Sequence, residues 1–517
     1  MTTLNADATR KILTYAECDG IDAWRATNKF ARETASDDLV WRAAATRDFY
    51  GGAGAGRDYH GQPVDFSPAP ATPEAPASRS NGAPCERVNH PETWREAYVC
   101  WRRLALRVDG PRDNYPRYAN APRTVWQESV HERPRGERRE RRCGDPFHAP
   151  TWLGVCAAWR AIKAALAGTP AVASLRPPAS QKDLAYVGAR SLRYCYAVHD
   201  GQALAFDEAI RSQNRRQMKA AQATIFHGIF GGFSAYDYVV CTRFRPIAAV
   251  VAEIAATDEE EAGSGDELAN KQGNWTCHHM FSFGANYRGD RRFQVCSADR
   301  VMFVEGNARA APDGPDAFLR WFAEYARRVA ARAYRVAPIM PDAPDVSAGV
   351  VLFPDADAGD DCRVVEAVTN GVRVRASSVY LPNHPSGFAY SIRLARTEGE
   401  PCQLMSRHWK IFDGSRTNDV VGDGVIGKFP VLREGGWRDD HQVANMGHGF
   451  AAAVDAGEDR SGEFVYQSMS GRLSGGTSAG SFRGEIEFFP GEVASPTGPP
   501  FRAAVPEFPL RRGRFIY

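Results

Sequence analysis

Residues 372–377 have the sequence VRVRAS and residues 388–394 have the sequence FAYSIRL, and these two stretches decide the fold of the last third of the chain. In each, apolar side chains alternate with polar or small ones, a period of two that is typical of a strand with one buried face. The alternating apolar residues are Val372, Val374, Ala376, Phe388, Tyr390, Ile392 and Leu394, followed by Phe464, Tyr466, Ile486 and Phe488. Short strands of this kind between glycine-rich turns predict an antiparallel β-sandwich.

The middle of the chain mixes helix and strand signals. Residues 151–168 (TWLGVCAAWRAIKAALAG) carry apolar side chains at helical spacing and end at a glycine, with a proline just beyond. Residues 316–329 (DAFLRWFAEYARRV) predict a second amphipathic helix, with Asp316 at its cap position. The acidic stretch 257–272 predicts an exposed loop. We therefore expect a central α/β domain, separated from the sandwich by a proline-rich linker at 338–362.

The N-terminal part is predicted to be helical and interrupted by a linker. Residues 1–50 have helical spacing, whereas 51–92 is rich in glycine, proline and alanine and predicts a flexible linker. Residues 93–150 predict a helical connector, in which Trp94, Tyr98, Trp101 and Leu104 recur at three- and four-residue steps. The basic strip at 132–142 (ERPRGERRERR) suits a nuclear-import patch, a phosphate-binding strip or a solvated linker, and its glutamates and proline favour the linker.

Composition narrows the class of protein. The 517 residues are 43% hydrophobic and 24% charged with a net charge of +2, which predicts a soluble multidomain protein that binds neither nucleic acid nor membrane. The start, MTTLNADATRK, lacks the order of a signal peptide, and the eleven cysteines form no CxxC pair. We expect reduced thiols, no metal site, and residence in the cytoplasm, the nucleus or both.

Four motifs of the last third resemble the ApaG domain and occur in that family's order: CQLMSRHWKIFDG (402–414), VVGDGVIGKFPVL (420–432), FVYQS with GTSAGSF (464–482) and FRAAVPEFPL (501–510). The resemblance implies that residues 363–517 form a fibronectin-like, all-β sandwich. This agrees with the strand alternation.

A glycine pattern lies inside the second motif. Gly422, Gly424 and Gly427 match GxGxxG, the fingerprint of a dinucleotide site when a helix follows. Here the strand-like KFPVLREGGW follows, so we interpret the glycines as positive-φ positions in a tight loop, with a weak anion-binding nest of amides as the alternative. No cofactor and no catalytic residue is predicted.

The first fifty residues resemble the F-box family. The family's apolar pattern falls on seven positions, which the resemblance implies are contacts with a Skp-type adaptor; Asn5 and Ala8 depart from it, standing where proline and leucine are usual. An ordinary helical hairpin with inward-packed aromatic side chains is the alternative. The seven positions are Leu4, Ile12, Leu13, Ile21, Trp24, Leu39 and Trp41.

The central domain, 151–337, resembles the SUKH family. YCYAVHDGQ (194–202) matches that family's Asn/Asp-Gly-Gln turn, and GIFGGFSAYDY (228–238) lies where the family has a glycine-bearing segment. An all-α F-box, a central α/β SUKH-like domain and a C-terminal ApaG sandwich, in this order, resemble the architecture of F-box only protein 3 and its plant relatives.

The resemblances imply a non-catalytic substrate receptor of an SCF-type ubiquitin ligase. It would dock on a Skp-type adaptor, and through it on a cullin scaffold, and would bind an unknown target through the SUKH and ApaG domains. Two alternatives stay open at this point. One is a non-ligase interaction scaffold with a degenerate F-box, and the other is a nucleotide- or phosphate-binding ApaG protein.

Overall fold

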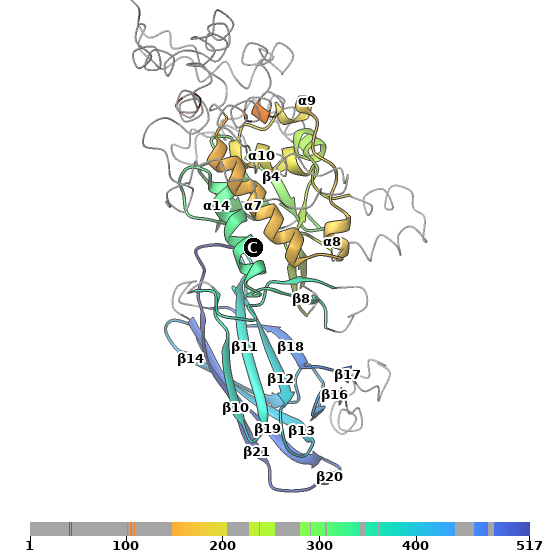
Figure 1. Cartoon of the computed structure of the whole chain (residues 1–517). Coiled ribbons are helices and arrows are strands. Elements are labelled where there is room, and N and C mark those ends of the chain that lie inside the picture. The colour runs from red at the N-terminus through yellow and green to blue at the C-terminus, as the bar shows by residue number, and fades with distance from the viewer. Residues whose placement is uncertain are drawn as a thin grey trace, which may run out of the picture.

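The computed structural model in Figure 1 describes the middle and the last third of the chain almost throughout. The predicted F-box apart from Trp41 and Ala43, the 51–92 linker, most of the 93–150 connector and the 257–272 loop lie outside the described residues. The described residues are 41, 43, 101, 104, 105, 108, 147–203, 227–236, 238–253, 280–289, 291–305, 308–341, 348–359, 362–439, 460–473 and 480–517.

Three helices form one layer of the central domain. α7 (Ala149–Ala165) and α14 (Ala317–Ala330) run side by side in Figure 1, and α10 (Arg190–Val198) packs against both. The ring centroids of Trp159 and Phe322 lie 5.0 Å apart across the α7–α14 contact, and both side chains are buried. Both predicted helices are therefore present. The short helices α8 (Pro170–Ala173) and α9 (Gln181–Leu184) connect α7 to α10.

The start of α14 differs from the sequence prediction. Asp316 occupies the cap position with a left-handed φ of 51°, but its side chain does not cap the helix; it accepts hydrogen bonds from Thr151 (2.8 Å) and Arg190 (2.9 Å). Asp299 and Ser191 cap the helix instead, accepting from the amides of Phe318 and Leu319 at 3.2 and 3.1 Å. A cap brought in from a distant loop leaves no local sequence signal. Burial raises the pKa of Asp299.

Two small sheets complete the central domain. The first is antiparallel, in the order β3 (Arg243–Phe244), β4 (Met280–Ala285), β5 (Arg292–Cys296), β6 (Met302–Val304), β7 (Ala308–Arg309). The second has the order β2 (Tyr238–Cys241), β1 (Gly232–Ala235), β9 (Ala348–Val351), β8 (Arg335–Pro338), with β1 and β9 parallel. The predicted central α/β character is therefore present in the structure.

The last third is a β-sandwich, as predicted. One sheet has the order β10 (Val365–Thr369), β11 (Val372–Tyr380), β12 (Phe388–Arg396), β18 (Phe464–Met469). The facing sheet is built on β13 (Cys402–Phe412) and β19 (Gly480–Glu492), with β14 (Thr417–Asp423) and β15 (Pro430–Arg433) beside β13 and β21 (Phe501–Leu510) beside β19. Its shorter strands are β16 (Gly436–Asp439), β17 (Arg460–Ser461) and β20 (Ser495–Pro496). All the alternating apolar residues named above are buried between the sheets.

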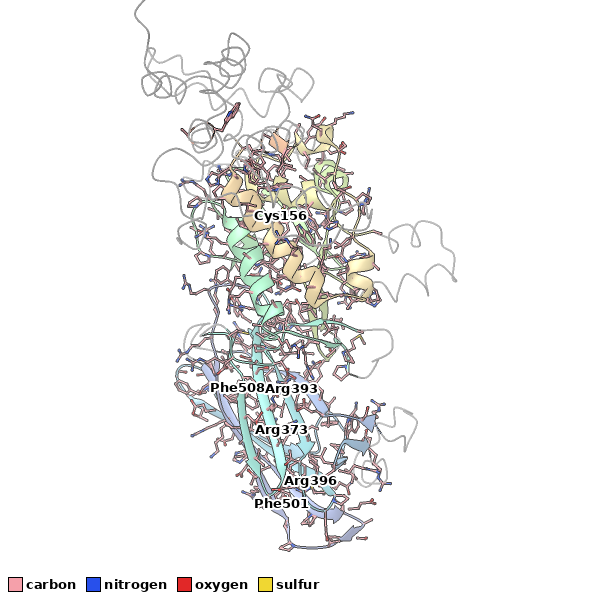
Figure 2. All side chains as sticks on the ribbon, viewed as in Figure 1. Cys156, Arg373, Arg393, Arg396, Phe501 and Phe508 are labelled. Carbon is pink, nitrogen blue, oxygen red and sulfur yellow. The ribbon has the colours of Figure 1, made fainter. Side chains whose placement is uncertain are left out.

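The central domain and the sandwich are packed together. Ser234 of β1 donates to Gln467 of β18 at 2.8 Å, and Ser468 donates to Tyr236 at 2.8 Å. Arg393 of β12 is buried against Asp355, and burial together with the nearby Arg335 lowers its pKa to about 10. Figure 2 shows Arg393 toward the central domain and Arg396 at the far end of the same strand.

The predicted 338–362 linker contributes to this junction. Its residues 348–351 form β9, and Leu352 and Phe353 are buried in the same apolar cluster as the central helices. The apolar run VVLF between the prolines explains the difference, because four consecutive apolar side chains are stabilised by burial. β12 is also buried on both faces, although alternation predicted one exposed face, because its second face packs against the central domain: Ala389 joins the central apolar cluster and Arg393 donates to the Pro354 carbonyl at 3.3 Å.

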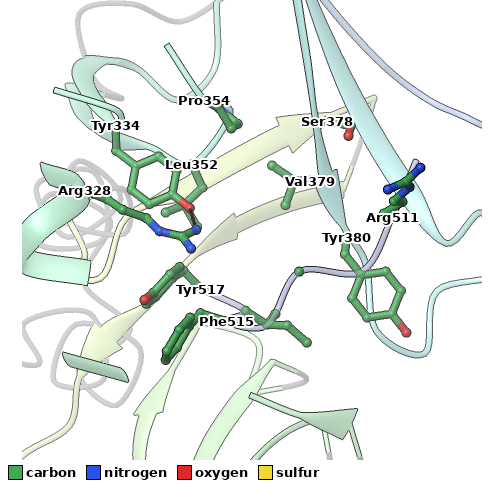
Figure 3. Close-up of a pocket in the computed structure, with 12 residues that line it drawn as sticks. Arg328, Tyr334, Leu352, Pro354, Ser378, Val379, Tyr380, Arg511, Phe515 and Tyr517 are labelled. Carbon is green, nitrogen blue, oxygen red and sulfur yellow. Dashed lines mark hydrogen bonds between the residues drawn. The ribbon is translucent and has the colours of Figure 1, made fainter. Parts of the chain in front are cut away.

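The segment after β21 returns to the central domain and ends at the junction (Figure 1). Trp321 of α14 donates to the carbonyl of Ile516 at 2.7 Å, and Ile516 donates to Ala310 at 2.9 Å. Arg291, which is fully buried, bonds Glu305 at 2.7 Å and the carbonyl of Tyr517. A cavity of about 40 Å³ lies beside this segment, where Arg328 points toward the rings of Tyr334 and Tyr517 (Figure 3).

Candidate interaction sites

Of the seven predicted adaptor contacts, the structure describes Trp41. Its side chain is fully buried and belongs to the apolar cluster of the central domain, which also contains Trp101, Leu104 and Phe147. The rings of Trp101 and Phe147 lie 5.9 Å apart. The other six positions lie outside the described residues, so the adaptor surface stays a prediction. In this conformation Trp41 stabilises the chain's own core.

The SUKH-like motif at 194–202 builds the interior of the central domain. The Gln202 side chain accepts from the amides of Ile229 (2.9 Å) and Phe244 (3.1 Å), and donates to three oxygens between 2.8 and 3.2 Å away. Asp200 accepts from the amide of Ile247 at 2.8 Å, and burial raises its pKa. Buried polar groups need hydrogen-bond partners. The motif therefore holds together the segments that contain Ile229, Phe244 and Ile247.

The glycine pattern of the sandwich begins at the end of β14 and continues into a tight turn before β15; both strands pair with β13. Val425 and Lys428 exchange two backbone hydrogen bonds of 2.9 and 3.0 Å around Ile426 and Gly427, whose φ values are 48° and 70°. Positive φ at both central residues is what a type I′ turn requires. A strand follows the glycines where a dinucleotide site requires a helix.

The three glycines have different structural roles. Gly424 has a φ of 56°, and a β-carbon there would meet the carbonyl oxygen of Lys428 at 2.7 Å. Gly427 also has a positive φ but open space around it. The prediction of a positive φ is wrong for Gly422, which lies in β14; its missing β-carbon leaves room for the Arg407 guanidinium, 3.0 Å from where that carbon would be. A glycine that makes room for a long side chain within a strand gives the same sequence pattern as a glycine required by a turn.

The loop's polar groups are bonded within the protein. The amide of Gly424 donates to Met405 at 2.7 Å, and the amide of Phe429 donates to Asp439 at 3.2 Å. Arg407 donates to the carbonyls of Asp423 (2.9 Å) and Gly424 (2.5 Å). Because these amides and this cation are already engaged, the loop offers few donors to a phosphate.

A hollow of about 250 Å³ lies on the outer face of the same sheet. His408 bonds Asp419 at 2.6 Å and lies 3.8 Å from Glu485, and Arg502 bonds Glu485 at 2.7 Å. The negatively charged carboxylates of Asp419 and Glu485 would repel a phosphate bound in this hollow. The lining residues are Ser406, Arg407, His408, Val421, Glu485, Glu487 and Arg502.

Sequence reasoning missed two features. The first is the exposed strand β14, whose valines resembled those of any half-buried strand. The second is the aromatic end Phe515–Tyr517, whose apolar side chains were the available signal for docking on the central domain. Among the described residues, no helix is long and apolar enough to cross a bilayer, and no cluster of metal-ligating side chains occurs.

Comparison with known proteins finds an ApaG match in the C-terminal sandwich and a similarity to an F-box protein. Residues 382–442 match the ApaG domain family. The C-terminal sandwich is an ApaG domain. The chain is also similar to F-box protein SKIP16 of Arabidopsis thaliana, with 28% identity over 326 residues covering 56% of this chain and 64% of that protein. It thus spans a little under two thirds of that relative.

The ApaG similarity extends to bacterial proteins. Protein ApaG of Anaeromyxobacter dehalogenans is 40% identical over 74 residues, which cover 13% of this chain and 59% of that protein. Protein ApaG of Xanthomonas oryzae is 51% identical over 49 residues, which cover 9% of this chain and 39% of that protein. A crystal structure of the putative ApaA protein from Bordetella pertussis aligns with 26% of this chain at 27% identity and a TM-score of 0.19.

Proposed function

We propose that this chain is the substrate-recognition subunit of an SCF-type ubiquitin ligase in the cytoplasm or nucleus. Its N-terminal F-box docks on a Skp-type adaptor and thereby on a cullin, while the central domain and the ApaG sandwich bind the target. The similarity to F-box protein SKIP16 over 326 residues is the observation that carries the proposal. The chain itself performs no covalent step; it raises the effective concentration of the target near the ubiquitin-loaded enzyme.

The junction gives this receptor a defined geometry. The Ser234–Gln467 bond, the buried Arg393 beside Asp355 and the docking of Ile516 against Trp321 connect the two folded parts at three separate places. A target bound to the sandwich is therefore held at a fixed place relative to the central domain. Fixed placement restricts which target lysines reach the enzyme.

Adaptor binding is tested by co-expressing the full chain with a Skp-type adaptor and measuring how much adaptor co-purifies. Leu13→Asp should abolish the complex, because a carboxylate cannot replace an apolar anchor in a desolvated interface. Val40→Asp is the matched control, since the F-box pattern does not use position 40. Unchanged adaptor recovery with a soluble Leu13→Asp chain would refute the proposal.

A second candidate function is favoured by one observation. Trp41 is fully buried and belongs to the apolar cluster of the central domain, so this residue packs within the chain's own core. An interaction scaffold that binds its partners without an adaptor would use Trp41 as part of its own core and not as an adaptor contact. The two functions are separated by the same co-purification, because a scaffold retains its other partners and recovers no adaptor with the unmodified chain.

A further inference from the structure

Among the described edge strands of four or more residues, β14 has the largest exposed share. β21 is a longer edge strand with β19 as its one strand partner, but three of its ten residues are exposed and it packs against β10 and β11. β14 hydrogen-bonds with β13 along residues 417–423, and five of its seven residues are exposed. In the described part of the chain, β13 is its one strand partner, and Figure 1 shows it at the margin of the sandwich. In an antiparallel pair, alternate N–H and C=O groups of an edge strand point away from the partner. β14 therefore presents a row of backbone groups on which a further strand can form.

Other edges of the described sheets are shorter or covered. β3 and β7 have two residues each, β2 and β8 have four, and β2 is at least half-buried throughout. β10 packs against β21 of the facing sheet, whose Ala504 donates to the Thr369 hydroxyl at 3.4 Å. β14 is therefore more exposed than the other described edge strands of four or more residues.

Exposed apolar side chains gather at β14 and the turn that follows it. Seven large apolar residues are exposed in the described chain, and three of them are Val420 (39% exposed), Val421 (72%) and Ile426 (46%). Edge strands that must stay free of partners carry charged side chains, proline or a bulge. β14 (TNDVVGD) carries two aspartates but neither lysine nor proline, so a partner of opposite charge can pair with it. Val420 and Val421 are adjacent in the strand and therefore lie on opposite faces, so Val421 is the exposed apolar side chain of the outer face.

Ile426 has a backbone conformation that is unfavourable for an isoleucine. Its φ of 48° lies in the left-handed region, which β-branched residues avoid, and the first central position of a type I′ turn favours asparagine, aspartate or glycine. Backbone strain of this kind clusters at functional sites, where the strained residue contributes to binding or catalysis. Ile426 lies shortly after the end of β14, so its side chain is placed to contact a ligand that binds along this edge.

The side chains on the outer face of β14 specify what can bind. Asp419, Val421 and Asp423 alternate along this face, opposite Lys410, His408 and Ser406 of β13. A strand added on the free side places every second residue directly opposite these three positions, where opposite charges and apolar pairs are stabilising. The complementary segment therefore has a basic residue, an apolar residue and a second basic residue at every second position.

We propose that β14 is a docking edge for an extended segment of a target protein with the pattern basic-x-apolar-x-basic, which adds to the sheet as a strand and contacts Ile426 at its end. The backbone of the segment bonds β14, and its apolar side chain packs on Val421 beside the hollow. Its basic side chains pair with Asp423 and with Asp419, which also bonds His408 at 2.6 Å. This deepens the proposed receptor function by naming the class of target segment, and it rests on that function only for the use to which binding is put.

The test uses the full chain without any adaptor, so that failure of adaptor docking does not affect it. The probe is a fluorescein-labelled peptide Ser-Thr-Lys-Thr-Val-Thr-Lys-Thr-Ser, compared by fluorescence anisotropy with the peptide that has Glu in place of both Lys. The Lys peptide should bind at least about tenfold more tightly. Equal affinity for the two peptides would overturn the proposal.

Charge reversal on the edge should reverse this preference. In the double variant Asp419→Lys/Asp423→Lys the Lys peptide should lose about tenfold or more in affinity and the Glu peptide should gain. The control variant Glu434→Lys/Glu507→Lys makes the same change of net charge at exposed sites away from β14 and should keep the original preference. A loss of the same size in the control would mean that net charge alone drives binding, which also overturns the proposal.

Ile426→Asn separates binding from folding. Asparagine suits the turn, so the variant should melt at a higher temperature while binding the Lys peptide several-fold more weakly. A stabilised variant with unchanged affinity would remove Ile426 from the site. If sedimentation showed that the free chain forms a dimer, and Asp419→Lys/Asp423→Lys abolished that dimer, the edge would be a dimer interface and the target-segment assignment would be wrong.

Discussion

Replacing each of the three glycines at 422, 424 and 427 by alanine should destabilise the protein in a definite order. At Gly427 an alanine meets open space, so the cost is the left-handed φ alone, about 1 kcal/mol. At Gly424 the new β-carbon also lies 2.7 Å from the Lys428 carbonyl oxygen and 3.0 Å from the Phe429 ring. Backbone cannot move as freely as a side chain, so we expect a cost of about 3 kcal/mol there.

Gly422 provides the internal control. Its backbone is extended, and the atom that an added β-carbon would approach, at 3.0 Å, is the end of the flexible Arg407 side chain. The change in the free energy of unfolding should stay within about 0.5 kcal/mol. Urea unfolding of the full chain, followed by tryptophan fluorescence, measures all three variants. A Gly422→Ala cost as large as that of Gly424→Ala would refute the assignment of separate roles.

Three further predictions concern other parts of the chain. Trp41→Ala should lower the free energy of unfolding by about 3 to 5 kcal/mol, because the side chain is fully buried; an unchanged melting temperature would contradict this. Gln202→Leu should cost about 2 kcal/mol or more, because the amides of Ile229 and Phe244 lose their acceptor, whereas exposed Gln181→Leu should cost little in the same melting experiment. Calorimetric titration with NAD, ATP and pyrophosphate should give no heat of binding, and micromolar affinity abolished by Gly424→Ala would restore a phosphate site.

Strand alternation was sufficient to predict the sandwich, because its period of two is set by side chains that face a single core. Val372, Val374 and Ala376 show this, being fully buried between the two sheets. Helices α7 and α14 were predicted for the analogous reason, since each buries one continuous apolar stripe. Local patterns of this kind depend on neighbouring residues alone.

The features that escaped prediction depend on residues distant in the sequence. The cap of α14 comes from Asp299 and Ser191. β9 pairs with the nearby β8 and also, at Val351, with Gly232 of β1 more than a hundred residues earlier. Within the site, Gly422 was assigned a turn because GxGxxG does not reveal where β14 ends. The exposure of Val421 follows from β14 being an edge, a property of sheet order that strand alternation does not contain.

Adaptor docking is the central claim of this account, and a direct titration tests it. The purified full chain is titrated with a purified Skp-type adaptor in a calorimeter, with the Leu13→Asp chain as the reference. The account predicts one-to-one binding with a Kd of about 1 μM or tighter for the unmodified chain and none for the variant. Absence of binding by a folded, unmodified chain would contradict the account and leave the interaction scaffold in its place.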